Sequence, residues 1–321
     1  MSLPLPAHYA PDAVGSLFVE RAGLIASAAT DWRREHRLQP AAADAVRVAA
    51  FGIDCQVGFC HPDASLYVPG AVDDMTRVAG WLYRNLDRIT TLIWSLDTHQ
   101  VHQIFHPAWW ADPSGAPPAP FTNIRAADVD AGRWIPRRAP EASRDYVHRL
   151  EETGRYTLTI WPYHTLLGGL SHALLPALME ATLFHAVARD AEPRFEAKGS
   201  HPWTESYSVL APEVQELQGQ RVGELNSPLL QTLLAHDRVY VFGEASSHCV
   251  RATLLDLLDQ IQQVDPALAR KVVVLSDAMS PVPSPPLDPL PPALDFAAQA
   301  RDALQRCADA GMRLCTTAEA V

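Results

Sequence analysis

The chain has 321 residues, and its hydrophobic fraction of 48% is enough to form a substantial core. The formal net charge of -11 at pH 7 argues against a nucleic-acid backbone or an anionic membrane surface as the main partner. The five cysteines are odd in number and show no Cys-x-x-Cys spacing, so we expect reduced thiols rather than a disulfide framework or a zinc ribbon.

In chain order, residues 1–44 are expected to form an N-terminal extension with one helix over 13–36. The first forty residues lack a basic start followed by an apolar run, so no signal peptide is expected and the protein is expected to be cytoplasmic.

From residue 45 to 321, short β-branched runs alternate with longer amphipathic segments, a pattern typical of strand–helix units around a parallel sheet. The predicted strands are 46–54, 91–97, 194–198, 238–245, 271–277 and 313–317, and the predicted helices are 72–86, 171–189, 227–235, 249–264 and 294–310. This order predicts one domain with a three-layer α/β/α fold and a doubly wound, mainly parallel sheet.

Two proline-rich stretches interrupt this pattern, at 107–140 and 281–292. The first predicts a long irregular insertion at about 107–155, and the second predicts a loop between a strand and a helix. The uncharged stretch 156–179 is long enough to raise the question of a membrane span, but it contains two prolines, two glycines and two histidines. We therefore interpret it as buried globular chain.

Reactive side chains stand at the predicted carboxyl ends of four strands, where open parallel sheets bind their ligands. Asp54, Asp97 and Lys198 end three strands, and the fourth leads through the turn 243–248 to Cys249 at the start of a helix. Acids at strand ends are also ordinary turn residues, so each position alone indicates little. Together they predict an acid, a second acid, a cation and a thiol at one edge.

This set is suited to nucleophilic catalysis. A helix N-terminus and a cation such as Lys198 lower the pKa of a thiol and favour the thiolate of Cys249. Asp54 is then expected to take the thiol proton and to pass it to a departing amine. His248 is adjacent to the thiol, but neighbouring positions at a helix start point about 100° apart. We therefore assign His248 a structural or substrate-facing place.

A second cluster surrounds Asp97. An extended backbone places Asp97 and His99 on one face, and His164 follows the strand-like run 156–160. Two imidazoles and one carboxylate suit Zn²⁺, Fe²⁺ or Mn²⁺. The chain has thirteen histidines, however, and the alternative is that those near position 99 only line a helix face. Spacing alone leaves both interpretations open.

Several segments resemble the isochorismatase-like cysteine hydrolases, and among these the nicotinamidases. The similar segments are GIDCQVGFC at 52–60, DTH at 97–99, WPYH at 161–164, KG at 198–199 with ESYS at 205–208, and GEASSHCV at 243–250. They occur in the family's order and span roughly residues 46–255.

The resemblance implies a role for each matched residue. Asp54 would be the general base, Lys198 the family's lysine and Cys249 the nucleophile. The metal ligands would be Asp97, His99 and His164, with zinc as the first choice and iron or manganese as alternatives. Phe59 and Trp161 would be the aromatic walls of the substrate pocket. A cis peptide at Glu244–Ala245 would turn the amides of Ala245 and Cys249 toward the oxyanion.

The activity so implied is hydrolysis of a small carboxamide, with nicotinamide as the best candidate, through a cysteine thioester. Three departures from the family pattern bear on the pocket: Val57-Gly58, the tripeptide at 246–248, and the long insertion. The alternatives are another small amide or ureido compound, an isochorismate-type vinyl ether, water activation by the metal itself, and a non-catalytic metabolite-binding homologue. The expected partner is a small-molecule amide, and the sequence leaves association into a homo-oligomer open.

Overall fold

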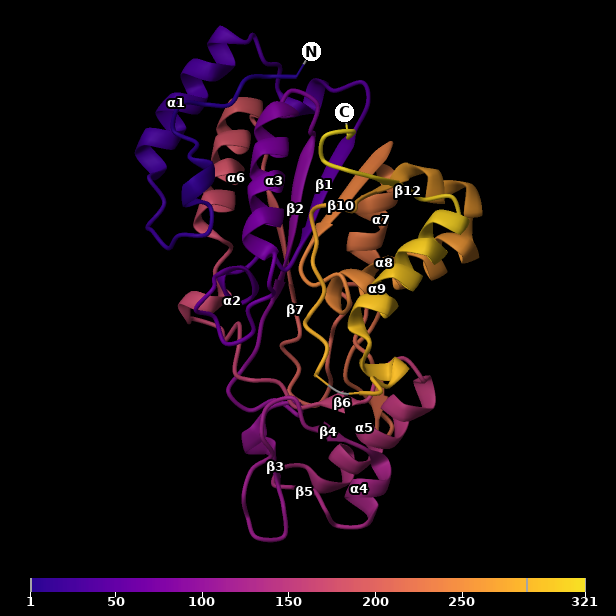
Figure 1. The fold of residues 1–321 in the computed structure, drawn as a ribbon. Coiled ribbons are helices and arrows are strands. Elements are labelled where there is room, and N and C mark those ends of the chain that lie inside the picture. Colours follow the sequence, from indigo (N-terminus) through magenta and orange to yellow (C-terminus); the bar gives the residue numbers. More distant parts are fainter. Residues whose placement is uncertain (1, 287, 321) are drawn as a thin grey trace.

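The computed structural model describes residues 2–286 and 288–320. Within these residues the central sheet has six strands, all parallel to their neighbours, in the order β12-β11-β10-β1-β2-β7 (Figure 1). The strands are β1 (Val48–Ile53), β2 (Thr91–Asp97), β7 (Arg194–Lys198), β10 (Arg238–Gly243), β11 (Val272–Leu275) and β12 (Arg313–Cys315). The predicted doubly wound parallel sheet is confirmed.

Helices flank this sheet. They are α1 (Ala22–Glu35), α3 (Ala71–Arg84), α6 (Pro176–Arg189), α7 (Ser227–Ala235), α8 (Cys249–Val264) and α9 (Phe296–Asp309), with the short α2 (Val57–Cys60) beside β1. Helix α6 packs against both α3 and α1, and α8 packs against α9. The predicted apolar stripe of α8 is buried throughout: Val250, Leu254, Leu257, Leu258 and Ile261. The hydrophobic core lies between these helices and the sheet.

The strand order places a topological switch point between β1 and β10. The chain leaves β1 toward β2 and β7, and later returns to the other side of β1 as β10. Ile53 and Gly243, the last residues of these strands, are paired across the switch point. A Cβ on Gly243 would lie 2.1 Å from the Ile53 carbonyl oxygen, so only glycine permits this approach. Ligands of doubly wound sheets bind at such a point.

The N-terminal extension is fastened to the outer surface of α6. Arg21 forms a two-pronged contact with the buried Glu180, in which Nε donates to Oε1 at 2.9 Å and Nη2 to Oε2 at 2.7 Å. The predicted helix over 13–36 is shorter than expected, because Pro11–Ala13 form a separate 3-10 turn and α1 begins only at Ala22. The domain boundary at residue 44 stays a prediction.

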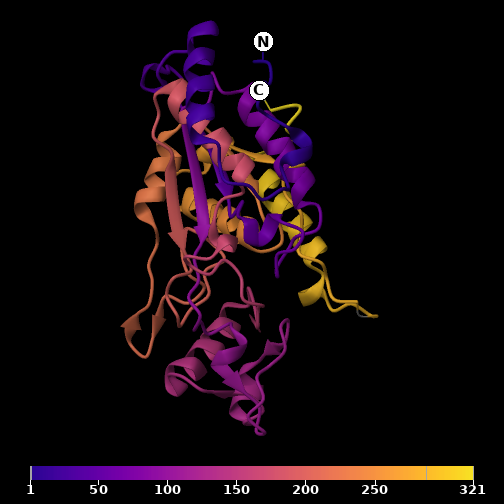
Figure 2. The ribbon, with the colours of Figure 1, turned by 90° about the vertical axis from the view of Figure 1, so that its left-hand side faces the viewer.

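The insertion is less irregular than predicted. It contains the helices α4 (Ala126–Asp130) and α5 (Pro140–Thr153), and the two-residue strand pairs β3 (Trp110–Ala111) with β5 (Ile135–Pro136), and β4 (Asn123–Ile124) with β6 (Leu158–Thr159). The proline that appeared to break the chain at 140 opens α5, where its missing N–H costs no helical hydrogen bond. The insertion lies at the opposite end of the molecule from both termini (Figures 1 and 2).

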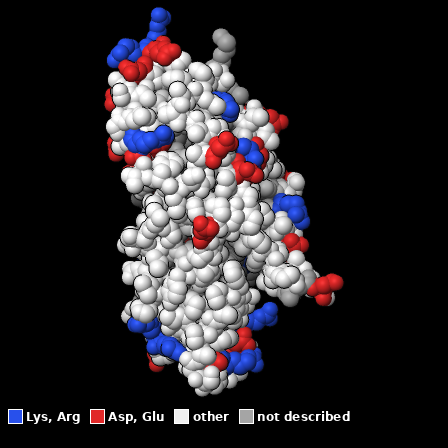
Figure 3. Space-filling model, turned by 60° about the vertical axis from the view of Figure 1, so that its left-hand side comes forward, with Lys and Arg blue, Asp and Glu red and all other residues white. Residues whose placement is uncertain are grey.

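Two further elements differ from prediction. The helix predicted over 171–189 begins at Pro176, because residues 170–172 form a 3-10 turn and Leu175 is extended before the proline. A small hairpin, β8 (Glu216–Leu217) with β9 (Gln220–Arg221), had no counterpart in the prediction. No helix among the described residues is both long and apolar enough to cross a lipid bilayer. On one face, charged side chains of both signs gather at the two ends around a largely uncharged band (Figure 3).

Candidate active site

The turn after β10 presents Cys249. The chain leaves Gly243 through a cis peptide at Glu244–Ala245, as the resemblance implied, and α8 begins at Cys249. The thiol is 6% exposed and lines a small cavity, so it is buried without being sealed in the core. The start of α8 directs its positive end toward this sulfur.

Lys198 lies at the centre of the predicted catalytic group. Its Nζ is 2.9 Å from Asp54 Oδ2, and it donates to Asp97 Oδ1 at 2.7 Å and to Cys249 Sγ at 3.6 Å. Asp54 Oδ1 in turn accepts a hydrogen bond from Ser95 Oγ at 2.5 Å. The structure thus brings the acid, the cation and the thiol together from β1, β7 and α8.

Burial sets the protonation of this group. It raises the pKa of the Cys249 thiol, and although Lys198 opposes it, Asp54 and Asp97 raise the pKa further, to well above the ordinary value. Burial also raises the pKa of Asp54 against the charge of Lys198. For Lys198 itself, burial lowers the pKa, but Asp54 and Asp97 outweigh burial and hold it well above its usual range. Burial and the two carboxylates thus act against the thiolate of Cys249 that Lys198 and the helix start favour.

Two backbone amides of the turn and the start of α8 have no backbone acceptor among the residues that the structure describes. Neither Ala245 N–H nor Cys249 N–H donates a backbone hydrogen bond within the described part of the chain. The amide of Val250 is already committed to the Ala245 carbonyl, at 3.2 Å. The Ala245 and Cys249 amides are consequently free to act as the predicted oxyanion donors.

The three residues predicted to bind a metal converge on one point. One ligand atom each from Asp97, His99 and His164 lies within 4.8 Å of the others, and all three residues are buried. His99 Nε2 is 2.7 Å from Asp97 Oδ2, and His164 Nε2 is 3.4 Å from the same oxygen.

The surroundings of this triad fit a divalent metal. His99 Nε2 is buried, and its one close polar neighbour among the described residues is Asp97 Oδ2, a carboxylate oxygen 2.7 Å away that can share a metal with it. The outer nitrogens are held by carbonyls, with His164 Nδ1 2.7 Å from Pro162 O and His99 Nδ1 3.2 Å from Gly199 O. Such contacts fix the tautomer that leaves Nε2 free to ligate.

Gly199 and Gln56 position the triad. At Gly199, φ is +74°, and a Cβ there would lie 2.8 Å from His99 Cε1. Gln56 clamps the Asp97 backbone from both sides: its Nε2 donates to Asp97 O at 2.9 Å, and its Oε1 accepts from Asp97 N at 2.7 Å. The role of Gln56 depends on a contact between distant segments, so the sequence did not reveal it.

The cavity beside Cys249 is narrow, with a volume of about 30 Å³. Phe59 and Trp161, the predicted aromatic walls, both line it. Tyr207, Glu205 and His248 also line it, although the sequence suggested a role only for His248. Trp161 Nε1 donates to Tyr207 Oη at 3.0 Å, which closes one side.

Two titratable groups of this wall are shifted by their surroundings. Burial raises the pKa of Glu205 to about 7. Burial lowers the pKa of His248 to about 3, so its imidazole is neutral at physiological pH. His248 Nδ1 lies 2.9 Å from Ser247 Oγ, and its ring faces Trp161 edge-on. The prediction that His248 is not the thiol's base partner is consistent with this arrangement.

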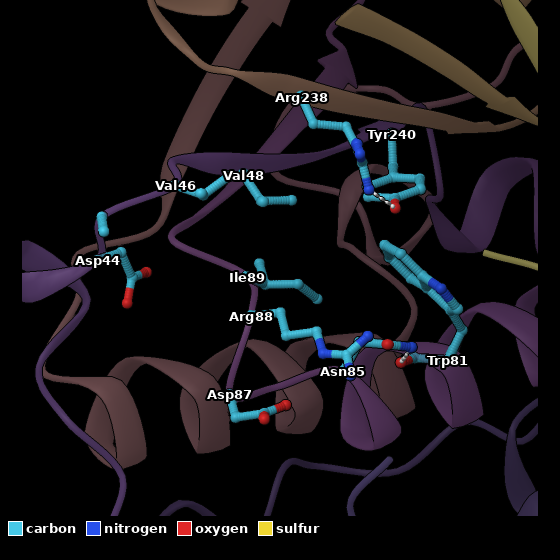
Figure 4. A pocket seen from close by; sticks show the side chains of 11 residues that line it. Asp44, Val46, Val48, Trp81, Asn85, Asp87, Arg88, Ile89, Arg238 and Tyr240 are labelled. Atoms are coloured by element: carbon cyan, nitrogen blue, oxygen red, sulfur yellow. Dashed lines mark hydrogen bonds between the residues drawn. The ribbon is translucent and has the colours of Figure 1, made fainter. Parts of the chain in front are cut away.

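A separate hollow of about 340 Å³ lies at the amino-terminal ends of β1 and β10 (Figure 4). It lies beside Trp81, Asn85 and Arg88, and the Asn85 side chain donates to Trp81 O at 3.0 Å. None of the residues proposed for catalysis lines it. The hollow is thus separate from the candidate active site at the carboxyl edge of the sheet.

The comparisons with known proteins agree on the fold. No protein-family profile matches the chain, and no curated protein sequence matches it. Among solved structures, it is similar to a nicotinamidase/pyrazinamidase of Acinetobacter baumanii, with 18% identity over 85% of this chain and 97% of that one, at a TM-score of 0.52. It is also similar to the yeast nicotinamidase Pnc1p, with 15% identity over 83% of this chain and 98% of that one, at 0.51.

These similarities identify the fold of the chain. The chain has the α/β fold that nicotinamidases have, across nearly the full length of those proteins. The resemblance inferred from the sequence motifs is confirmed at the level of the fold.

Proposed function

We propose that the chain is a cysteine amidohydrolase that cleaves a small carboxamide, with nicotinamide as the first candidate substrate. The observation that supports this most directly is the position of Lys198 Nζ, 2.9 Å from the Asp54 carboxylate and 3.6 Å from the Cys249 sulfur, at the wall of a cavity. The structural likeness to two nicotinamidases points to the same chemistry.

In the first half of the reaction, Cys249 attacks the amide carbonyl while its proton passes to Asp54. Because burial raises the pKa of both groups, the thiol remains protonated until attack, and Asp54 is a better base than an exposed aspartate. The carbonyl oxygen becomes an oxyanion that accepts hydrogen bonds from the Ala245 and Cys249 amides. Each such donor lowers a barrier of this kind by about 3 kcal/mol.

In the second half, the tetrahedral intermediate collapses to a thioester. Asp54 returns the proton to the departing nitrogen, and ammonia leaves. Asp54 then takes a proton from water, the hydroxyl adds to the thioester, and the carboxylic acid and the thiol are released. Lys198 remains an ammonium throughout and stabilises the charge that moves between Asp54 and the sulfur.

Asp97, His99 and His164 would hold the divalent metal, with zinc as the first choice and iron or manganese as alternatives. When bound, such an ion supplies a Lewis-acid position for a ring nitrogen of the substrate. Phe59 and Trp161 would orient an aromatic ring between them. On this proposal the partner is a small amide, and neither a nucleic acid nor a membrane is required.

The test is release of ammonia from a panel of small carboxamides, with nicotinamide first, by the metal-loaded protein. Cys249→Ala should reduce turnover by at least about a thousandfold while substrate binding stays measurable. Cys315→Ala, in β12, is the matched control and should retain activity. Hydrolysis that persists in Cys249→Ala, or a wild-type protein that cleaves no amide of the panel, would overturn the proposal.

A further inference from the structure

A much larger cleft adjoins the cavity at Cys249. Its volume is about 770 Å³, and it shares two wall residues, Tyr207 and His248, with that cavity. One wall is formed by the insertion around Tyr156, another by the segment around Phe296, and the floor by the first turn of α8. Figure 1 shows these segments side by side near β6 and the start of α9. The two shared residues place the cleft next to the cavity that contains the thiol.

The charge of this cleft is opposite to that of the whole chain. The formal net charge of the protein is -11, yet the described residues that line the cleft include three arginines and a single glutamate: Arg125, Arg155, Arg251 and Glu151. A cleft of one sign with low-dielectric walls concentrates ligands of the opposite sign. This local reversal favours an anionic ligand.

Arg251 is the cation nearest in sequence to the thiol, two residues after Cys249 in the same helical turn. Its guanidinium carbon lies 5.1 Å from the centre of the Tyr156 ring, so stacking fixes its direction. Its Nη1 is buried and has no hydrogen-bond acceptor among the described residues. This donor is therefore available to a ligand group.

Arg155 also lines the cleft, and it is partly paired, with its Nε 4.0 Å from Glu213 Oε2. Its Nη1 donates to Asp256 at 2.9 Å, whereas its Nη2 is buried and has no acceptor among the described residues. Burial raises the pKa of the neighbouring Glu213 to about 8, so near neutral pH this carboxyl is largely protonated and neutralises little of the arginine's charge. Two guanidinium groups thus retain unused N–H donors in one cleft.

The space between the arginines and the thiol is walled by rings. Tyr156 and Tyr207 lie 4.5 Å apart by ring centroid, and His248 and Phe296 lie 4.8 Å apart. Such walls suit a flat or apolar segment between two polar ends. The site can therefore hold a ligand that has its amide at Cys249 and an anionic group at Arg251.

We propose that Arg251 and Arg155 bind an anionic group of the substrate, so that the substrate is a carboxamide bearing a carboxylate or phosphate at a short distance from the scissile amide. This inference rests on the proposed amidohydrolase function and names its substrate class. Guanidinium groups recognise carboxylate and phosphate through the same paired N–H donors.

The experiment compares three amides: nicotinamide, a nicotinamide with a carboxylate-bearing chain on its ring, and one with a phosphate-bearing chain of equal length. Wild-type kcat/KM should be at least tenfold higher for one of the two anionic amides than for nicotinamide. The preferred amide shows whether the site binds a carboxylate or a phosphate. Arg251→Gln should remove most of this preference, and Arg251→Lys should restore part of it. Arg34→Gln, on exposed α1, makes the same change in net charge and should keep the preference.

Binding to Cys249→Ala, measured by calorimetry, separates the two proposals. Tighter binding of an anionic amide than of nicotinamide, lost when Arg251→Gln is added, supports the substrate class even if turnover is absent. Turnover of nicotinamide with no gain from either anion would overturn the inference and leave the amidohydrolase proposal intact. An anion preference that survives both Arg251→Gln and Arg155→Gln would show that other groups bind it.

Discussion

Lys198 donates a hydrogen bond to Asp97 across 2.7 Å, and this contact joins the candidate metal site to the candidate nucleophile. The other oxygen of Asp97 faces His99 and His164, while the same ammonium reaches Asp54 and Cys249. One buried cation therefore compensates two buried carboxylates and contacts the thiol. A substitution in the candidate metal site should therefore alter the environment of Cys249, and a substitution near Cys249 should alter the environment of the metal ligands.

Replacing Lys198 should destabilise the fold as well as stop catalysis. Lys198→Met leaves Asp54 and Asp97 buried without their shared cation, and removal of one partner from such a cluster costs about 3–5 kcal/mol. Lys271→Met is the matched control, because Lys271 is the chain's second and last lysine and, within residues 2–286 and 288–320, its Nζ donates to the Leu234 carbonyl alone. Urea unfolding measures both, and equal stability of the two variants would contradict the assignment.

The metal assignment predicts a loss of bound ion on single substitution. His99→Ala and His164→Ala should each reduce the metal content of purified protein from about one ion per chain to a small fraction of that. His148→Ala, on α5 and 3.1 Å from Asp130, changes a surface histidine and should leave the content unchanged. Metal analysis by mass spectrometry decides between these outcomes, and full occupancy in His164→Ala would refute the ligand set.

Stability should fall as pH rises through a window set by Glu213. Burial raises the pKa of Glu213 from 4.5 to about 8, so the folded state binds this proton more tightly than the unfolded state. The corresponding stability is fully present below about pH 4.5 and is lost toward pH 8, at up to about 1.4 kcal/mol per pH unit.

Glu213→Gln should therefore reduce the slope of the unfolding free energy with pH between 5 and 8, most clearly between 7 and 8, above the pKa of about 7 of Glu205. The exposed Glu216→Gln is the control and should leave the slope in place. Urea unfolding at several pH values gives the comparison. A wild-type slope retained in Glu213→Gln would show that another group titrates in this window.

The glycine at the end of β10 should tolerate no side chain. At Gly243, φ is +124° and a Cβ would overlap the Ile53 backbone, whereas Gly219 has φ of +71° and nothing within 4 Å of its Cβ position. Gly243→Ala should thus destabilise the protein by about 1–3 kcal/mol more than Gly219→Ala, which reports backbone strain alone. Thermal unfolding compares them, and equal losses would contradict the close packing at the switch point.

Much of the fold followed from local patterns. The predicted bounds of β2, β7, α7 and α8 agree with the structure, because each apolar run there ends at a polar residue or a turn. The strand ends placed Asp54, Asp97, Lys198 and Cys249 at one edge, which the parallel sheet then brought together.

What the sequence did not reveal depends on contacts between distant segments. The upward shift of the Cys249 pKa follows from burial, which no local pattern reports, and it opposes the thiolate that the helix start and Lys198 favour. The places of Gln56 and Tyr207 in the site arise from contacts with Asp97 and Trp161. The paired guanidinium groups of Arg155 and Arg251 come together only because the insertion packs against the start of α8.

The switch point between β1 and β10 joins two strands that are far apart in the sequence, so the residues of the candidate site are synthesised at different times. During translation, the candidate base Asp54, the candidate metal ligands and Lys198 are all synthesised before Cys249. The strand that presents Cys249 enters the sheet beside β1, which was made long before. Among the residues proposed for proton transfer and metal binding, the thiol of Cys249 is thus the last to be synthesised, and a chain released before it would carry Asp54, Asp97 and Lys198 without the sulfur.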